Sequence, residues 1–424
     1  MSRIENLTSK LRTTGFFHIF GSSVLSKIIT FMSSIILVRI LSKQEYGVYS
    51  YAWNIYSLIL LLDGIGMVSG CLQLCSENSK NKPLCNSIYQ YSTKIGILFD
   101  FVLGMILLGI AFFVPLPIAG SNSLLILLCC LPMATFVYEM QIIYLRANKE
   151  NILYAKYSFM QVLAVFLLSV VGAFVFKAAG LILARYIAFL LIAALSMNYI
   201  KPFGMQRISL SSSIKKALFK ISVISMANNG LSSLLYLLDI FIIGLIAADG
   251  LSVASYKVAT TIPNALAFIP SALITYVYPY FAEHREDKRW CMEKYKIILI
   301  AMGLFNLVVS IGLFVTAPWI IKLFFGANYM DAIASFRILS VSYFFSGTFR
   351  VISGNLLVTQ RKLGFNLFVA IFSGIVNIVG DYILVLHYGS EGAAVATLIV
   401  VLLTSLLSTG YLFYVYKDEK RGST

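Results

Sequence analysis

Ten ionisable residues lie within long apolar stretches of this sequence. The five cations are Lys27, Arg185, Lys257, Arg337 and Arg350, and the five acids are Asp63, Asp100, Glu139, Asp239 and Asp381. Each such group costs at least ~2.5–3.5 kcal/mol at the centre of a membrane helix, so none is expected to face lipid. Two interpretations remain open. The charges form structural ion pairs or reach an interface, or they line a cavity, where Arg and Lys donors bind an anion such as phosphate strongly.

The depth of each residue helps to separate these interpretations. Lys27 lies about eleven residues into the first apolar stretch, roughly 16 Å from its inner end, so it is too deep to reach the interface comfortably. Arg350 is nearly as deep in its own stretch. Lys257 and Asp239 lie in consecutive stretches and could form a salt bridge, a gate, or an ion and substrate site. The residues closest to span ends, for which a structural role is an equal alternative, are Asp100, Glu139 and Arg185.

The composition requires a membrane around these groups. The chain of 424 residues is 59% hydrophobic and 12% charged, with a mean hydropathy of +0.86. Soluble proteins carry roughly 25% charged residues. The net charge of +15 is explained by cations in cytoplasmic loops, so no nucleic-acid partner is predicted. With three histidines and six scattered cysteines, free thiols are expected and no metal site is predicted.

About 20 apolar residues are needed to cross a membrane as a helix, and windows of that length predict twelve spans. They are 16–38, 46–70, 93–114, 121–145, 154–176, 180–200, 217–247, 252–281, 297–316, 331–358, 364–386 and 391–416. With the N-terminus inside, 24 Lys and Arg residues fall on the inner side and 4 on the outer side. This asymmetry predicts that both termini are cytoplasmic. The outer loops are short, so no extramembrane catalytic domain is expected.

The two halves of the sequence resemble each other. Residues 145–163 align with 357–375, and residues 177–184 align with 389–396, pairing Gly180 with Gly392. The repeat predicts two six-helix units, 1–205 and 206–424, joined by a basic, Ser-rich linker. Because six is even, both units have the same orientation and an axis along the membrane normal relates them. Such paired units with a cavity between them are typical of transporters.

Two prolines interrupt the predicted span 252–281. Pro263 and Pro270 are seven residues apart and therefore share one face of the helix. Each removes a backbone hydrogen bond, which is tolerated in a membrane where a helix lines a cavity or must bend. A hinge is one interpretation, and a static kink is the other.

The stretch "ILVRILSKQEYGVYSYAWNIYSLILLLDGIG", residues 36–66, is the most specific motif. Its R-x-L, polar break, E-Y-G and aromatic run resemble the first-to-second helix region of the Wzx-type O-antigen and polysaccharide flippases. These belong to the multidrug/oligosaccharidyl-lipid/polysaccharide exporter superfamily. The resemblance implies an all-α membrane protein with twelve transmembrane helices in two six-helix pseudo-symmetric lobes, a MATE-like fold. The cations of the break, Arg39 and Lys43, are predicted to lie on the outer side, either in a simple turn or at an outer-rim site that meets the leaving substrate.

The resemblance also implies a function in the bacterial inner membrane. The expected substrate is an undecaprenyl-pyrophosphate-linked oligosaccharide, moved from the cytoplasmic to the periplasmic leaflet by alternating access, without catalysis. Membrane lipids and, as further partners, a polysaccharide polymerase and a chain-length regulator are implied. Asp239 is the candidate for coupling to protons or sodium, and no other cofactor is expected. The predicted substrate-cavity residues are Lys27, Lys257, Arg350, Arg337 and Asp63.

Two other functions are weighed against this one. A multidrug antiporter of the same superfamily should favour organic cations, which fits poorly with five cations inside the membrane. An integral-membrane polysaccharide polymerase typically carries a sizeable outer loop, whereas no outer loop here exceeds about fifteen residues. A structural scaffold would need neither a repeat nor buried charges.

Overall fold

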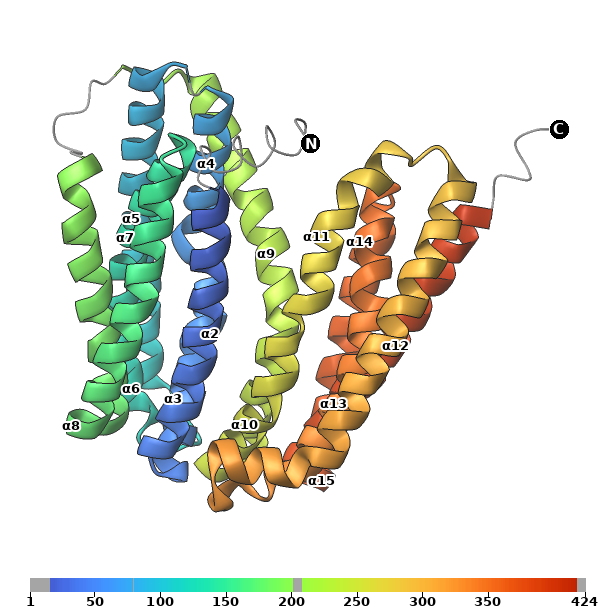
Figure 1. The fold of residues 1–424 in the computed structure, drawn as a ribbon. Coiled ribbons are helices and arrows are strands. Elements are labelled where there is room, and N and C mark those ends of the chain that lie inside the picture. Colours follow the sequence, from blue (N-terminus) through green and yellow to red (C-terminus); the bar gives the residue numbers. More distant parts are fainter. Residues whose placement is uncertain (1–15, 79, 201–207, 418–424) are drawn as a thin grey trace. The chain divides into compact units, whose positions relative to one another are not determined.

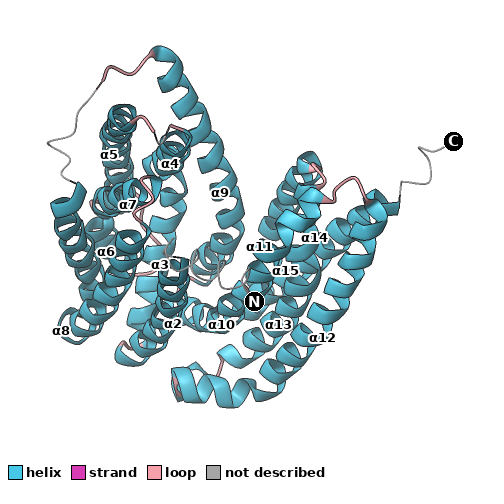
Figure 2. Ribbon diagram, turned by 45° about the horizontal axis from the view of Figure 1, so that its top comes forward, coloured by secondary structure: helices cyan, strands magenta, loops and turns pink. Residues whose placement is uncertain are grey.

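The computed structural model describes residues 16–78, 80–200 and 208–417, and its ordered elements there are all helices (Figures 1 and 2). The first half of the chain forms α2 (Phe16–Ile40), α3 (Lys43–Ile59), η1 (Leu60–Gly66), α4 (Met67–Glu77), α5 (Lys82–Phe113), α6 (Ser121–Leu128), α7 (Leu131–Ala147), α8 (Asn151–Ile200) and α9 (Ser212–Ala247). The second half forms α10 (Gly250–Leu266), α11 (Phe268–Glu283), α12 (Lys288–Ile320), η3 (Ile321–Phe325), η4 (Ala327–Tyr329), α13 (Ala332–Phe345), η5 (Ser346–Arg350), α14 (Val351–Thr359) and α15 (Leu363–Lys417).

Within the described residues, nine helices are long and apolar enough to cross a membrane. The chain is therefore a multi-pass membrane protein. The predicted spans are mainly helical, and two predicted pairs of spans, 154–176 with 180–200 and 364–386 with 391–416, each share one continuous helical segment. The count of twelve crossings stays a prediction.

Two helices are too long to cross a membrane once. α8 has 50 residues and α15 has 55, so either would be more than twice the length that spans a hydrocarbon core of about 30 Å. Each reverses direction part of the way along. In α8 the rings of Tyr157 and Tyr199 lie 6.0 Å apart, and in α15 the rings of Phe365 and Tyr411 stack at 3.9 Å. Both helices are therefore helical hairpins.

The two hairpins have the same local geometry. α8 reverses at Lys177 (φ 53°, ψ −130°) and α15 at Gly389 (φ 56°, ψ −134°). Three residues later a glycine packs against the other arm. A Cβ on Gly180 would lie 1.9 Å from the carbonyl oxygen of Gly172, and one on Gly392 would lie 2.1 Å from that of Leu384. Positions 212 apart thus share one backbone conformation, as the aligned pair Gly180 and Gly392 predicts.

The chain divides into two compact units, Met1–Leu234 and Leu235–Thr424, called unit 1 and unit 2 below. Unit 1 has an apolar core that includes Ile88 and Phe136, and unit 2 has one that includes Ile352 and Leu356. The predicted join between residues 205 and 206 lies in 201–207, outside the described residues.

The motif around Glu45 forms the junction between α2 and α3. Ser42 caps α3 by accepting from the Glu45 N–H at 3.2 Å, and the Glu45 carboxylate accepts from the Ser42 N–H at 3.2 Å. This reciprocal capping box satisfies two backbone donors at the helix start. Glu45 also pairs with Lys177 at 2.6 Å, so the junction and the α8 reversal lie at the same end of unit 1. That agrees with the predicted topology, which places both on the outer side.

The prolines of the predicted hinge flank a break. α10 ends at Leu266 and α11 begins at Phe268, with Ala267 between them. Pro263 and Pro270 lie on either side, and both are buried. The location of the interruption follows from the prolines, while a hinge motion stays a prediction.

Candidate functional site

The cations inside the predicted spans do not pair with the acids. None of the five forms an ion pair with a carboxylate among residues 16–78, 80–200 and 208–417. The ion pairs that the structure shows lie at or near helix ends, such as Lys177 with Glu45 and Arg285 with Glu286 at 2.8 Å. The interpretation of these cations as structural ion pairs is therefore wrong for the described part of the chain.

Three of these cations have side chains with no hydrogen-bond or ion-pair partner among the described residues. Lys27 is exposed on the surface of α2. Lys257 is half-buried on α10, and Arg350 is half-buried at the end of η5. η5 is a π-helical turn, a distortion that often marks functional sites and that the sequence did not reveal. These three side chains remain available to bind an anion.

The other two cations rest on aromatic rings. The Arg337 Nε–H donates to the carbonyl oxygen of Phe314 at 3.1 Å, and its guanidinium lies 5.3 Å from the Phe314 ring. The Arg185 guanidinium lies 4.0 Å from the ring of Trp53 on α3. Cation–π contacts of this kind stabilise a desolvated cation without a carboxylate. Arg337 is thus held against α12, and its predicted role in a cavity stays a prediction.

The acids of unit 2 gather around Asp239 on α9, which is 7% exposed. Its carboxylate accepts from the Tyr256 hydroxyl, from the Thr397 hydroxyl at 2.8 Å and from the Asn377 amide at 3.2 Å. Asp381 lies beside it and is fully buried, and neither of its oxygens has a partner among the described residues. The Asn377 amide oxygen is also without one. We call these five residues the unit 2 acidic cluster.

The unit 2 acidic cluster is rich in oxygen atoms. Its carboxylate, amide and hydroxyl oxygens are the donors that hard cations prefer. Buried carboxylates with no cationic partner are costly unless protonated or bound to an ion. Sequence analysis predicted Asp239 as the coupling residue and named Asp381 among the membrane acids. It did not predict that Asn377 and Thr397 join them, because hydropathy windows give no distance between helices.

The acids of unit 1 gather where the second predicted span is broken. Asp63, Gly64 and Ile65 have non-helical backbone angles, and Gly64 adopts φ +49° with the Phe136 ring packed against it. The Gly64 N–H donates to a carboxylate oxygen of Asp100 at 2.7 Å. The charges of Asp100 and Glu139 act on Asp63. We call Asp63, Asp100 and Glu139 the unit 1 acidic cluster. Sequence analysis placed Asp63 with the substrate and did not predict this grouping.

The remaining predicted site residues lie at the ends of helices. Arg39 is the last basic residue of α2 and is exposed, and Lys43 begins α3. Their predicted place at an outer rim stays a prediction.

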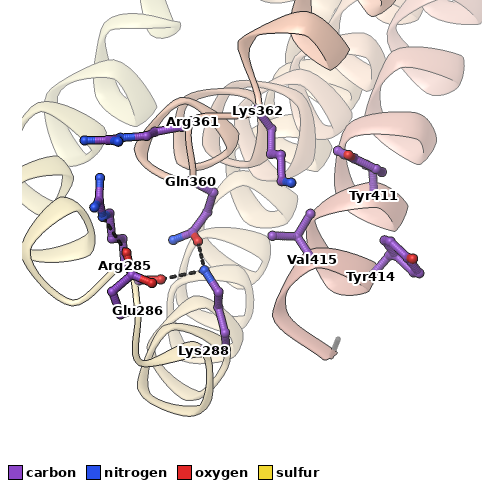
Figure 3. Close-up of a pocket in the computed structure, with 9 residues that line it drawn as sticks. All are labelled: Arg285, Glu286, Lys288, Gln360, Arg361, Lys362, Tyr411, Tyr414 and Val415. Carbon is purple, nitrogen blue, oxygen red and sulfur yellow. Dashed lines mark hydrogen bonds and ion pairs between the residues drawn. The ribbon is translucent and has the colours of Figure 1, made fainter. Parts of the chain in front are cut away.

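A separate cavity of about 490 Å³ lies at one end of unit 2 (Figure 3). Its lining residues are Arg285, Glu286, Lys288, Gln360, Arg361, Lys362, Tyr411, Tyr414 and Val415. Lys288 donates to the Gln360 side chain and, at 2.6 Å, to the carbonyl oxygen of Arg285, while Arg285 pairs with Glu286. Four cations face one carboxylate, so this cavity favours anions. By the predicted topology it lies on the cytoplasmic side.

Comparison with a family model gives a match over most of the chain. The model described as "Polysaccharide biosynthesis protein" matches residues 36–334. The match includes the 36–66 motif and both acidic clusters except Asn377, Asp381 and Thr397. No curated protein sequence matches the chain.

Solved structures match nearly the full length. An inward-facing multidrug resistance transporter of the MATE family, in the MOP superfamily, has a TM-score of 0.73 at 14% identity, covering 94% of this chain and 96% of its own. The lipid II flippase MurJ, in an inward closed conformation, has a TM-score of 0.73 at 14% identity, and the match covers 94% of this chain and 89% of MurJ. A MOP superfamily transporter from Pyrococcus furiosus has a TM-score of 0.61 at 13% identity, covering 96% of each chain. These similarities show the fold.

Proposed function

This chain belongs to the polysaccharide biosynthesis protein family, and we propose that it is a flippase for lipid-linked oligosaccharides. The family confirms the resemblance of residues 36–66 to the Wzx-type polysaccharide flippases. The proposed substrate is undecaprenyl pyrophosphate carrying one repeat unit of O-antigen or a related surface polysaccharide. The chain moves it from the cytoplasmic to the periplasmic leaflet of the bacterial inner membrane by alternating access, with both termini cytoplasmic.

One observation carries this proposal: cations of the predicted spans have no carboxylate partner among the described residues. Lys257 and Arg350 of unit 2 and Lys27 of unit 1 can give charge-assisted hydrogen bonds to a pyrophosphate. In a low-dielectric surrounding such bonds are stronger than in water. The glycan crosses with the pyrophosphate while the polyprenyl tail stays in lipid. Arg39 and Lys43 meet the pyrophosphate on the outer side as it leaves.

The break at Ala267 supplies a hinge for alternating access. Pro263 and Pro270 deprive the carbonyls one turn earlier of their usual partners, so the helix bends there at a lower cost than elsewhere. Lys257 lies one and a half turns before the first of these prolines. A change in bend would therefore move its ammonium relative to the rest of unit 2.

The unit 2 acidic cluster is the proposed coupling site. A sodium ion fits its donors, since Asp381 and Asn377 offer oxygens without partners and Asp239 and Thr397 complete the set. A proton on Asp381 is the alternative occupant. Replacing sodium by choline at fixed pH distinguishes them, because only sodium coupling is lost.

The proposal is tested by complementing a strain that lacks its own flippase and depends on this chain for surface polysaccharide. Lys257→Ala and Arg350→Ala should each abolish surface polysaccharide while immunoblots show normal amounts in the membrane. Lys257→Arg keeps the charge and should retain export. Lys294→Ala, an exposed cation near the start of α12, is the matched control and should export normally. Normal surface polysaccharide in both alanine variants would contradict the proposal.

An organic-cation antiporter is the second candidate, favoured by the fold shared with the MATE transporter. Such a protein needs an acid that its substrate can reach, and Glu139 is the exposed acid of the unit 1 acidic cluster. Expression in a strain without efflux pumps distinguishes the two functions. The flippase proposal predicts no change in resistance to organic cations, and an antiporter predicts a rise that Glu139→Gln removes.

A further inference from the structure

The unit 1 acidic cluster contains buried oxygen atoms without partners. Asp100 is 0% exposed, and its Oδ2 has no hydrogen-bond partner among the described residues. The same holds for Oδ1 of Asp63 and for the hydroxyl of Tyr56, which is 1% exposed. Native proteins rarely leave such groups unsatisfied, because each costs the desolvation of a polar atom. A ligand or a proton must therefore complete this site.

We propose that Asp63 and Asp100 bind one proton between their carboxyl groups, and that Glu139 exchanges this proton with water. The side chains of Asp63 and Asp100 are within hydrogen-bonding reach of each other. Two adjacent carboxylates in a low-dielectric surrounding cannot both stay ionised, so one proton is shared. The Glu139 side chain lies on the surface of unit 1, whereas Asp100 is buried, so Glu139 is the member of the cluster through which a proton can reach the pair.

The donor set selects a proton over a metal ion. The Gly64 N–H points at Oδ1 of Asp100, and a positive backbone dipole there opposes a metal cation at the same oxygen. A carboxyl pair with one shared proton needs no further ligands.

The surrounding charged and titratable groups leave the pair without a cationic partner. Asp63 on η1 is faced by Asp100 on α5 and Glu139 on α7. Tyr56 on α3 is close enough for the charges of Asp63 and Arg185 to act on its hydroxyl group. Arg185 on α8 is stacked on Trp53.

Exchange of the shared proton with water needs proton transfer only, with no other bond made or broken. The O–H bond of protonated Glu139 breaks as its proton passes to a water molecule, and a new O–H bond forms on the Asp63 carboxylate when water delivers a proton there. The reverse sequence releases the proton. Unit 1 therefore has a proton site separate from the unit 2 acidic cluster.

The test is infrared difference spectroscopy on the full-length protein in lipid nanodiscs, recorded between acidic and alkaline pH with sodium present. Wild-type protein should show a C=O stretching band of a protonated buried carboxyl group. Asp63→Asn and Asp100→Asn, each nearly isosteric, should each remove that band. Glu139→Gln should keep the band and slow its hydrogen–deuterium shift. Glu391→Gln, an exposed acid of unit 2, is the matched control and should change neither.

Two results would overturn the proposal. One is a band that persists in both aspartate variants, each eluting as folded protein by size-exclusion chromatography. The other is loss of ²²Na⁺ binding in Asp63→Asn, which would make the cluster part of a sodium site. Neither readout needs the oligosaccharide substrate. A negative result would therefore contradict the proton site and leave the flippase proposal, which is tested by surface polysaccharide, unaffected.

Discussion

The two acidic clusters lie in units with a similar hairpin but on different helices and with different chemistry. The unit 1 cluster is built from η1, α5 and α7 and contains carboxyl groups with one backbone donor. The unit 2 cluster is built from α9, α10 and both arms of α15, and adds an amide and two hydroxyl groups. The comparison indicates that the scaffold was duplicated while the ligand sites diverged.

The repeat shows where this divergence occurs. Positions 212 apart share one backbone conformation in the α8 and α15 hairpins, so Ser169 corresponds to Asp381 and Arg185 corresponds to Thr397. Unit 1 therefore has a guanidinium where unit 2 has a hydroxyl that donates to Asp239. A cation at this position excludes a second one, so a sodium site of the unit 2 kind cannot form in unit 1.

The largest expected effect comes from placing an arginine, the residue type of unit 1, at the corresponding position 397 of unit 2. Thr397→Arg places a guanidinium beside Asp239, where it should replace the bound ion and lower the affinity for ²²Na⁺ by about 100-fold or more, roughly 3 kcal/mol. Thr397→Ser keeps the hydroxyl and is the matched control. Sodium binding that is equal in the two variants would show that the ion lies elsewhere.

A smaller effect tests the shared scaffold. Gly180→Ala and Gly392→Ala each force a methyl group against a carbonyl oxygen of the opposite arm. Each should lower the free energy of unfolding by about 1–3 kcal/mol, and by similar amounts in the two units. Thermal unfolding in detergent measures both, with Gly312→Ala, which has open space around it, as the control. A large loss in one unit alone would argue against equivalent hairpins.

Substitutions at the two reversal residues should change the free energy of unfolding in opposite directions. Lys177 holds a positive φ that favours glycine, so Lys177→Gly should stabilise by about 1 kcal/mol. Its ion pair with Glu45 contributes little, since the Lys177 side chain is 71% exposed. Gly389→Ala should destabilise by about 1–3 kcal/mol. Shifts of the same sign in thermal unfolding would contradict the geometric match.

Much of the fold is readable from the sequence because it depends on local apolar runs. The predicted spans are mainly helical, and the polar break at Arg39–Tyr46 is a helix junction with a capping box at Ser42. The break between Pro263 and Pro270 was predicted from the prolines, but two other breaks were not. Asp63–Gly66 and the π-helical turn ending at Arg350 interrupt apolar runs without changing their hydropathy.

The candidate site was predictable only in part. Sequence analysis placed Lys27, Lys257 and Arg350 in a substrate cavity, and that role stays a prediction. The structure adds that these side chains have no hydrogen-bond or ion-pair partner among the described residues. The grouping of the acids was not predictable, since Asp239 meets Asn377 and Thr397 across 138 and 158 residues. Pairing acids with cations seemed the simplest arrangement, and the structure instead places acids beside acids and leaves three cations free among the described residues.

Binding of a soluble polyprenyl pyrophosphate, such as farnesyl pyrophosphate, to purified protein tests the division between cations and acids most directly. We expect wild-type protein and Asp63→Asn to bind it alike, because the acids do not contact the anion. The double variant Lys257→Ala/Arg350→Ala should bind it at least about tenfold more weakly, a change of about 1.4 kcal/mol or more. Equal affinity in the wild type and the double variant, measured by calorimetry, would contradict the account.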